Sequence, residues 1–320
     1  MPLVDIADLA VSFAQADGLV QAVRGISISV DMGESVGIVG ESGSGKSVTC
    51  MAALRLLRES PAKITATRLA LDGVDMLRAE KRQLAQMRGS VAAMIFQDPM
   101  TAFDPVFTIG HQIVETIQAH RNVSKSAANA EAISLLARVE IKNPANVMTS
   151  YPHQLSGGML QRAMIAMALS CRPKILFADE PTTALDVTVQ AQILQLIKAL
   201  QVEFGMGLIM VTHDLGVIAE TVDRVIVMYG GRVMEEGPVQ AIFDAPAHPY
   251  TRALLHSMPG QTAGQHRLIE IKGASPNPAN PPKGCPFHPR CDRAEPICAQ
   301  TDPAFVTLGQ NHRAACWVLQ

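Results

Sequence analysis

At 320 residues, 48% of them hydrophobic, the chain is long enough to form one large domain or two modest ones around a substantial core. Its formal net charge of −2 argues against a protein that binds nucleic acid through a basic excess. The longest apolar run, residues 163–169, is far shorter than the roughly 18–20 residues that cross a bilayer, and no signal-peptide pattern opens the chain. We therefore expect a soluble, cytoplasmic protein whose thiols are reduced.

The N-terminal part of the chain carries strand patterns around a glycine-rich loop. Residues 3–13 and 26–39 are rich in β-branched residues and bounded by glycine, which predicts strands. Residues 46–57 predict a helix, and the Asp-Gly pair at 72–73 predicts a hairpin turn. The short uncharged run 91–96 predicts a buried strand.

Helical periodicity dominates the middle of the chain, which predicts helices near 109–120 and 125–139 and a third that starts at Ser156 or Gly157. Strand–helix alternation then resumes, and it predicts a strand at 174–179, a helix at 187–204 and strands within 207–214 and 224–233. The fold class indicated by this alternation is α/β.

The order of these elements divides the chain into three parts. Residues 1–104 and 171–247 are predicted to form an α/β core, and residues 105–170 a helical subdomain inserted in it. Residues 248–320 form a C-terminal extension, in which proline, asparagine, glycine and cysteine dominate from about residue 258. This extension is expected to be loop-rich.

The glycine-rich loop GESGSGKS fits the pattern G-x-x-x-x-G-K-[ST], and it stands between a predicted strand and a predicted helix. Glycines let backbone N–H groups curl around phosphate oxygens, and the helix N-terminus adds a partial positive charge. Lys46 can reach the β- and γ-phosphates, and Ser47 can bind Mg²⁺. The predicted ATP-binding residues here are Gly40, Ser42, Gly43, Ser44, Gly45, Lys46, Ser47 and Val48.

An acidic pair ends the predicted strand at 174–179. Asp179 is placed to hold Mg²⁺, directly or through water. Glu180 follows it and can act as the general base toward the attacking water. Together with the phosphate loop, this pair predicts an ATPase.

The stretch LSGGMLQR at 155–162 resembles the LSGGQ signature of the ATP-binding-cassette (ABC) ATPases. Further family motifs follow the same order along the chain: Gln97 in FQDP resembles the Q-loop glutamine, and His213 in VTHD the switch histidine. Asp186 in TTALD resembles the D-loop aspartate, and Phe13 stands where the family has its adenine-stacking aromatic residue.

The resemblance implies a RecA-like α/β core plus a helical subdomain, and it implies residue roles. Catalytic roles fall on Glu180, His213 and Gln97, and magnesium-binding roles on Ser47, Gln97 and Asp179. The signature that faces a partner subunit's ATP consists of Leu155, Ser156, Gly157, Gly158 and Met159. Met159 replaces the family's glutamine, and because a thioether lacks the amide's hydrogen-bonding groups, we expect a weaker composite site there.

The stretch HPYTRALLHSMP at 248–259, with the SGGM form of the signature, resembles the ATPase subunits of importers for dipeptides, oligopeptides, nickel and related solutes. This resemblance implies a motor that couples ATP hydrolysis to uptake of di- or oligopeptides. It implies a peripheral protein at the cytoplasmic face of the inner membrane. The implied partners are a homologous ATPase subunit in a heterodimer, two transmembrane permease subunits and an extracytoplasmic solute-binding protein.

Two alternatives to peptide import stay open. The same motor could serve nickel, glutathione or an antimicrobial peptide, since an ATPase subunit does not touch the cargo. An alternative of a different class is a non-transport ABC ATPase that acts on nucleic acid or ribosomes. The single cassette, the absence of a basic tail block and the 248–259 stretch favour the importer and no nucleic-acid partner.

Four of the six cysteines gather in the extension with the spacing Cys285-x5-Cys291-x6-Cys298-x17-Cys316. In a reducing compartment such a group indicates metal more often than disulfides. No C-x2-4-C knuckle typical of structural zinc is present, so the spacing favours a 4Fe–4S cluster, as does the resemblance to importer extensions that carry these cysteines. Zinc and a site without metal remain alternatives.

Two histidines stand near this cysteine group in the sequence, and the other two cysteines are far from it. His288 and His312 are alternative ligands, and Cys50 and Cys171 are expected to be buried small hydrophobes. A short proline-rich segment has little core of its own, so a structural staple is favoured over a redox or iron sensor.

Overall fold

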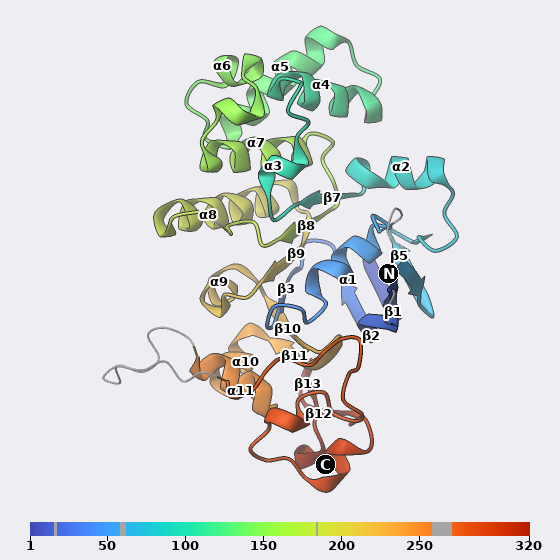
Figure 1. Ribbon diagram of the computed structural model, residues 1–320. Coiled ribbons are helices and arrows are strands. Elements are labelled where there is room, and N and C mark those ends of the chain that lie inside the picture. The colour runs from blue at the N-terminus through green and yellow to red at the C-terminus, as the bar shows by residue number, and fades with distance from the viewer. Residues whose placement is uncertain (16–17, 58–61, 184, 258–270) are drawn as a thin grey trace. The chain divides into compact units, whose positions relative to one another are not determined.

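The computed structural model describes residues 1–15, 18–57, 62–183, 185–257 and 271–320 (Figure 1). These residues form two compact units, which comprise Met1–Leu3, Val30–Glu34 and Leu71–Met210, and Val4–Ser29, Ser35–Ala70 and Val211–Gln320. Within the described ranges, no helix is both long and apolar enough to cross a bilayer. The predicted change of composition near residue 258 and the last two residues of the 248–259 stretch lie outside the described residues.

The first unit is built on buried parallel strands. Strand β7 (Ala92–Ile95) pairs in parallel with β8 (Ile175–Asp179), and β9 (Gly207–Thr212), most of which belongs to this unit, lies beside β8. Every residue of these strands is buried. Strands covered on both faces are apolar throughout rather than alternating, which is why the uncharged runs predict them correctly.

The helices of the first unit are α2 (Lys81–Ser90), α3 (Pro99–Ala102), α4 (Ile109–His120), α5 (Lys125–Arg138), α6 (Pro144–Thr149), α7 (Gly157–Leu169) and α8 (Val187–Phe204). The unit also contains the short η1 (Pro152–Gln154) and β6 (Val74–Asp75). Helices α4 to α7 pack on one another (Figure 1). Their starts match the sequence prediction because side-chain caps fix them: Thr108, Ser124 and Ser156 each accept a hydrogen bond from the N–H three residues on.

The second unit combines two pieces of sheet. In one, β10 (Arg224–Tyr229) pairs in parallel with β3 (Ser35–Val39) and antiparallel with β11 (Arg232–Pro238). The other contains β2 (Gly18–Val30), β1 (Val4–Gln15), β4 (Ala62–Thr65) and β5 (Arg68–Leu71). Its helices are α1 (Lys46–Ala53), α9 (Leu215–Thr221), α10 (Val239–Asp244) and α11 (Pro249–His256).

The C-terminal extension, which the sequence predicts to be loop-rich, also adds strands to this unit. Strand β13 (His312–Ala315) pairs antiparallel with both β11 and β12 (Phe305–Gly309). Three short 3₁₀ helices complete it: η2 (His288–Arg290), η3 (Pro296–Ala299) and η4 (Trp317–Leu319). Strand β12 has no buried residue, so it lacks the alternation that marks a half-buried strand, and its sequence reads as loop.

Other boundaries differ from the prediction in small ways. Helix α1 ends at Ala53, before the predicted end at residue 57. Asp72 and Gly73 have φ of 48° and 78°, the positive values that a type I′ hairpin turn requires. The segment 224–233 is divided between two strands by a turn at Gly230 and Gly231, whose φ values of 54° and 79° favour glycine.

Candidate nucleotide site and the cysteine group

The phosphate loop follows β3 and opens α1 in the second unit. Gly40 and Gly45 have φ of 151° and 99°. A Cβ at Gly40 would lie 2.1 Å from the carbonyl oxygen of Met228, and one at Gly45 would lie 2.4 Å from that of Ala22. Only glycine fits these positions, so the neighbouring strands determine the shape of the loop as much as its own sequence does.

Lys46 is the first residue of α1, and it is only 5% exposed. Its Nζ donates hydrogen bonds to the carbonyl oxygens of Gly40 (2.7 Å) and Glu41 (3.0 Å). The nearby Ser44 Oγ is buried and has no hydrogen-bond partner among the described residues. A phosphate oxygen held by the loop would satisfy this hydroxyl, so the residues present fit a nucleotide.

The other nucleotide residues predicted in this unit are exposed or half-buried. Ser42 and Gly43 are exposed at the tip of the loop, and Ser47 and Val48 are half-buried in the first turn of α1. Phe13 is half-buried on β1, opposite Ala62 of β4. His213 is exposed between β9 and α9.

The predicted general base belongs to the first unit, and it has a tightly held carboxylate. Asp179 ends β8 and is 5% exposed. Glu180 follows with φ of 45°, a backbone conformation that non-glycine residues rarely adopt and that clusters at functional sites. Its Oε2 accepts hydrogen bonds from Gln97 Nε2 (2.9 Å) and Thr183 Oγ1 (2.8 Å). The structure thus brings two of the predicted catalytic residues, Gln97 and Glu180, into direct contact.

The signature stretch forms the start of α7, as predicted. Leu155 precedes Ser156, whose hydroxyl caps the helix by accepting from Met159 N. A Cβ at Gly158 would lie 3.1 Å from Val189, whose N–H is in turn capped by Asp186 at 2.9 Å. The signature and D-loop residues are therefore neighbours within this unit.

The sequence interpretation missed several residues that support these motifs. Thr183 holds Glu180, and the buried Gln161 Nε2 donates to the carbonyl oxygen of Pro181 at 2.6 Å, which ties α7 to the end of β8. Glu41 occupies a position that the phosphate-loop pattern leaves open. The stretch 248–259, which resembles importer subunits, is the one part of its contacts with Tyr250 and the extension that the sequence marks, and it does not indicate a contact with the loop.

The four cysteines of the extension share one neighbourhood. Cys285, Cys298 and Cys316 are buried, Cys291 is half-buried, and Cys285 N donates to the carbonyl oxygen of Cys298 at 2.9 Å. Burial raises the pKa of the Cys285 thiol to about 12, and the other three thiols act on it in the same direction. Burial likewise raises the pKa of Cys291 and of Cys316. The raised pKa values favour the protonated thiol form of Cys285, Cys291 and Cys316.

The predicted metal site is not formed in the described part of the chain. No group of three or more histidine, cysteine, aspartate or glutamate side chains there is arranged to hold a metal ion. The two alternative ligands have other partners: His288 Nδ1 lies 2.9 Å from the carbonyl oxygen of Cys285, and His312 Nε2 lies 2.8 Å from Glu235 Oε1. The thiol donors suit a metal, but their present arrangement does not ligate one. As predicted, Cys50 and Cys171 are buried.

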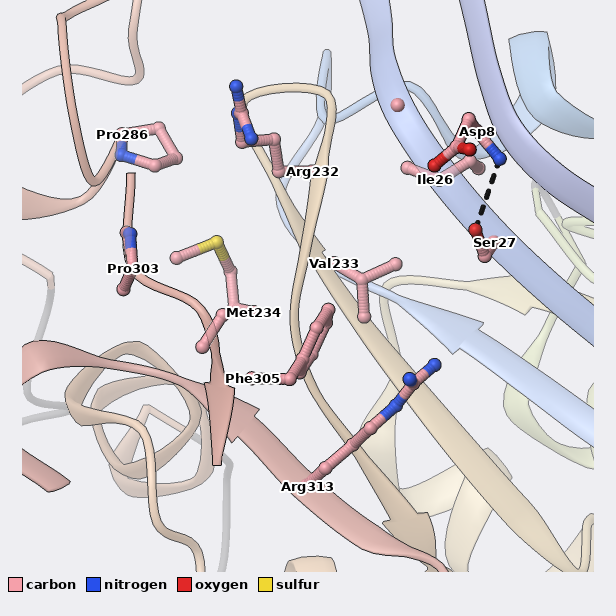
Figure 2. Close-up of a pocket in the computed structure, with 12 residues that line it drawn as sticks. Asp8, Ile26, Ser27, Arg232, Val233, Met234, Pro286, Pro303, Phe305 and Arg313 are labelled. Atoms are coloured by element: carbon pink, nitrogen blue, oxygen red, sulfur yellow. Dashed lines mark hydrogen bonds between the residues drawn. The ribbon is translucent and has the colours of Figure 1, made fainter. Parts of the chain in front are cut away.

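None of the predicted site residues lines the cavity of about 220 Å³ in the second unit, although Pro286 and Ala315, which line it, are the chain neighbours of Cys285 and Cys316. Figure 2 shows Val233, Met234 and Phe305 close together, with Arg232 and Arg313 on opposite sides of them. Both arginines are paired with carboxylates, Arg232 with Asp302 and Arg313 with Glu236. The charges of both arginines are thus matched, although Arg232 Nε is buried without a hydrogen-bond partner among the described residues.

Comparison with known proteins gives two family matches. Residues 23–183 match the model described as ABC transporter, and residues 234–298 match the model described as oligopeptide/dipeptide transporter, C-terminal region. The chain is 48% identical over 316 residues to a probable peptide ABC transporter ATP-binding protein of Sinorhizobium fredii, which covers 98% of this chain and 94% of that protein. It is 46% identical over 316 residues to the dipeptide transport ATP-binding protein DppD of Escherichia coli, with coverage of 99% and 96%.

A solved structure gives the same result for the fold. The chain is similar to the ATP-binding cassette MJ0796, in a dimeric post-hydrolysis state bound to ADP and phosphate, with a TM-score of 0.64 and 27% identity. The match covers 74% of this chain and 98% of that one.

Proposed function

Because the chain belongs to the family of ABC transporter ATP-binding proteins, we propose that it is the ATP-hydrolysing motor subunit of an importer for di- or oligopeptides. The full-length similarity to a dipeptide transport ATP-binding protein and the matched C-terminal region support peptide as the cargo class. We place the subunit peripherally at the cytoplasmic face of the membrane, where ATP is available.

The residue roles follow from the chemistry of phosphoryl transfer. The backbone N–H groups of the phosphate loop and the Lys46 ammonium bind the β- and γ-phosphates, and Phe13 stacks on the adenine. Ser47, Gln97 and Asp179 would hold Mg²⁺, which neutralises charge on these phosphates when bound. Glu180 accepts the proton of the attacking water, and we assign the switch histidine, His213, to the same reaction.

The observation that carries the nucleotide assignment is the phosphate loop with its buried Lys46 and with a Ser44 hydroxyl that has no partner in the described part of the chain. The test is a titration of the purified chain with Mg-ATP, compared with Lys46→Ala. Loss of a charge-assisted contact worth about 1.5–3 kcal/mol should weaken binding roughly 10- to 150-fold. Unchanged affinity in the variant would contradict the assignment.

The partners that we propose are a homologous ATPase subunit, two permease subunits and a solute-binding protein. In the first unit, Val106 and Phe107 are 68% and 44% exposed, and they precede a groove lined by Thr108, His111 and Val114. Exposed apolar residues beside a groove suit a helix of a membrane subunit. Co-purification of permease subunits would support the importer, whereas co-purification of RNA or DNA would favour the nucleic-acid alternative.

The identity of the cargo needs a different experiment, because the ATPase subunit does not contact it. The cognate solute-binding protein should be titrated with dipeptides, longer peptides, glutathione and nickel. Binding of peptides alone would support the proposed cargo, and binding of nickel or glutathione alone would replace it.

A 4Fe–4S cluster on Cys285, Cys291, Cys298 and Cys316, with zinc as the alternative, is a separate proposal. The nature of the donors and their common neighbourhood support it, whereas the lack of a formed ligand group among the residues that the structure describes speaks against a preassembled site. No step of the ATPase reaction is assigned to such a cluster. Its test is a metal analysis of the chain purified without oxygen.

A further inference from the structure

Three groups of the C-terminal extension meet one residue of the phosphate loop, Glu41. Its Oε2 accepts hydrogen bonds from Arg290 Nη1 (2.7 Å) and Ser275 Oγ (2.6 Å). Its backbone N–H donates to Tyr250 Oη at 2.9 Å. All of these residues belong to the second unit. Both the side chain and the main chain of the loop are therefore anchored from the extension.

Arg290 is held rigidly on the extension side of this contact. Its Nε donates to the carbonyl oxygen of Lys272 (2.9 Å), and its Nη2 donates to that of Ile271 (2.8 Å). Its Nη1 also donates to Tyr229 Oη at 3.0 Å. The side chain is only 7% exposed, whereas an adaptable surface arginine would be solvated. A planar guanidinium with all three nitrogens bonded presents a preorganised donor to Glu41.

Tyr250, like Arg290, is held in place by its surroundings. It is fully buried, and its ring packs against Tyr229 at 4.6 Å and Phe287 at 5.2 Å between ring centroids. The preceding His248 caps α11 by accepting from Tyr250 N at 3.0 Å. This gives the His-Pro-Tyr-Thr stretch a physical role, since it orients one buried hydroxyl toward the phosphate loop.

The anchored residue is linked to the residue that binds phosphate. Lys46 Nζ donates to the carbonyl oxygens of Gly40 and Glu41, so a shift of Glu41 moves an acceptor of Lys46. The loop can bind phosphate only if its amides keep their direction, and six of its eight positions are glycine or serine, which offer few packing contacts. An external anchor removes freedom that nucleotide binding would otherwise have to remove.

From these contacts we infer that Arg290 and Tyr250 are positioning residues of the nucleotide site, through which the C-terminal extension sets the affinity of the phosphate loop. This inference rests on the proposed nucleotide function. It assigns the extension a part in ATP binding that is independent of any metal at its cysteines.

The test is a double-mutant cycle on the full chain, with Mg-ADP as the probe. Arg290→Met and Glu41→Gln should each raise the Kd about 5- to 10-fold. The Kd of the double variant should be similar to that of either single variant, because both changes break the same contact. Tyr250→Phe, which keeps the buried ring, should raise the Kd about 3- to 10-fold. Each titration is made well below the melting temperature of that variant.

The matched control is Arg313→Met. Arg313 also lies in the extension and pairs with a glutamate, Glu236, at 2.8 Å, but the partner is on β11 and not on the loop. This variant should lower the melting temperature without changing the Kd. An equal loss of affinity in Arg313→Met would show that the rise in Kd reflects general destabilisation, and it would overturn the inference. An unchanged Kd in both Glu41→Gln and Tyr250→Phe would overturn it as well.

Lys46→Ala distinguishes a failure of the proposed nucleotide function from a failure of the positioning role. If it leaves the Kd unchanged, the nucleotide function itself fails. If it weakens binding while Glu41→Gln and Tyr250→Phe do not, only the positioning role fails. Should Arg290→Met not fold, the Glu41 and Tyr250 variants still decide the question.

Discussion

Gln97 and Glu180 are 83 residues apart in the chain, and they meet through a hydrogen bond of 2.9 Å from the amide Nε2 to the carboxylate Oε2. Thr183 Oγ1 donates to the same oxygen, so two neutral donors fix the orientation of the carboxylate. A general base must present its oxygen to a water molecule within hydrogen-bond reach, and such fixation reduces the cost of doing so.

We expect Glu180→Gln to slow turnover by roughly 10²–10³, about 3–4 kcal/mol on the barrier, because an amide cannot accept the proton of the attacking water. Nucleotide affinity should be preserved, since Glu180 does not bind the phosphates. The measurement is steady-state phosphate release together with a nucleotide titration.

Thr183→Val is the matched control for this experiment, because it removes one orienting bond and leaves the base in place. A loss of about 3- to 10-fold, much smaller than that of Glu180→Gln, is expected. Near-normal turnover in Glu180→Gln would refute the assigned base.

Met159 is 36% exposed at the start of the signature helix, where the family has glutamine. An amide there could donate and accept hydrogen bonds that a thioether cannot. We therefore expect Met159→Gln to raise the ATPase rate of the assembled heterodimer by about 2- to 10-fold. A rate that stays the same or falls would show that methionine does not weaken the composite site.

Burial lowers the pKa of His248 to about 3. Its Nδ1 caps α11, and its Nε2 is buried without a hydrogen-bond partner among the described residues, so the folded protein resists protonation of this ring. The unfolded chain takes up the proton near pH 6.5. The stabilising contribution is therefore complete above that pH and is lost as the pH falls toward 3, by at most about 1.4 kcal/mol per pH unit.

Urea unfolding between about pH 7.5 and 5 measures this slope. His248→Asn keeps an acceptor for the Tyr250 N–H but removes the titration, so its free energy of unfolding should depend less on pH. Equal slopes in the two proteins would show that another group titrates.

The metal proposal predicts that the chain purified without oxygen contains about four irons and four sulfides per chain and absorbs broadly at about 400 nm. Cys298→Ser should lose most of the iron, whereas Cys171→Ser, at a buried cysteine outside the group, should keep it. One zinc without colour would replace iron–sulfur by a structural zinc site, and no metal at all would end the proposal.

Local chemistry explains which features could be predicted from the sequence. The phosphate loop needs glycine at positions such as Gly40, where any side chain would collide with the backbone, so its pattern is specific. Helix starts at Ser124 and Ser156 were predictable because a hydroxyl cap is a short-range signal. By contrast, Arg290 meets Glu41 across 249 residues, and an ion pair between such distant positions leaves no pattern in a single sequence.

The arrangement of the four thiols, like the contact of Arg290 with Glu41, could not be predicted from the sequence. Their spacing is visible in the sequence, but whether thiolates converge on one ion depends on loop geometry that spacing does not determine. The signature region could be predicted only in part. Its motif is local, whereas the buried bond from Gln161 to Pro181 that supports it is a tertiary contact.

The pairing of β13 with β11 has a consequence for how the protein can be shortened. Without the last strands, β11 would present unpaired N–H and C=O groups along an open edge, which is a template for aggregation. The fully buried Glu235 carboxylate would also lose its contact with His312, which adds to the hydrogen bonds that it accepts from the N–H groups of Ala247 and His248. Removal of the C-terminal segment should therefore yield insoluble protein whatever its cysteines bind, so point substitutions are the informative way to study it.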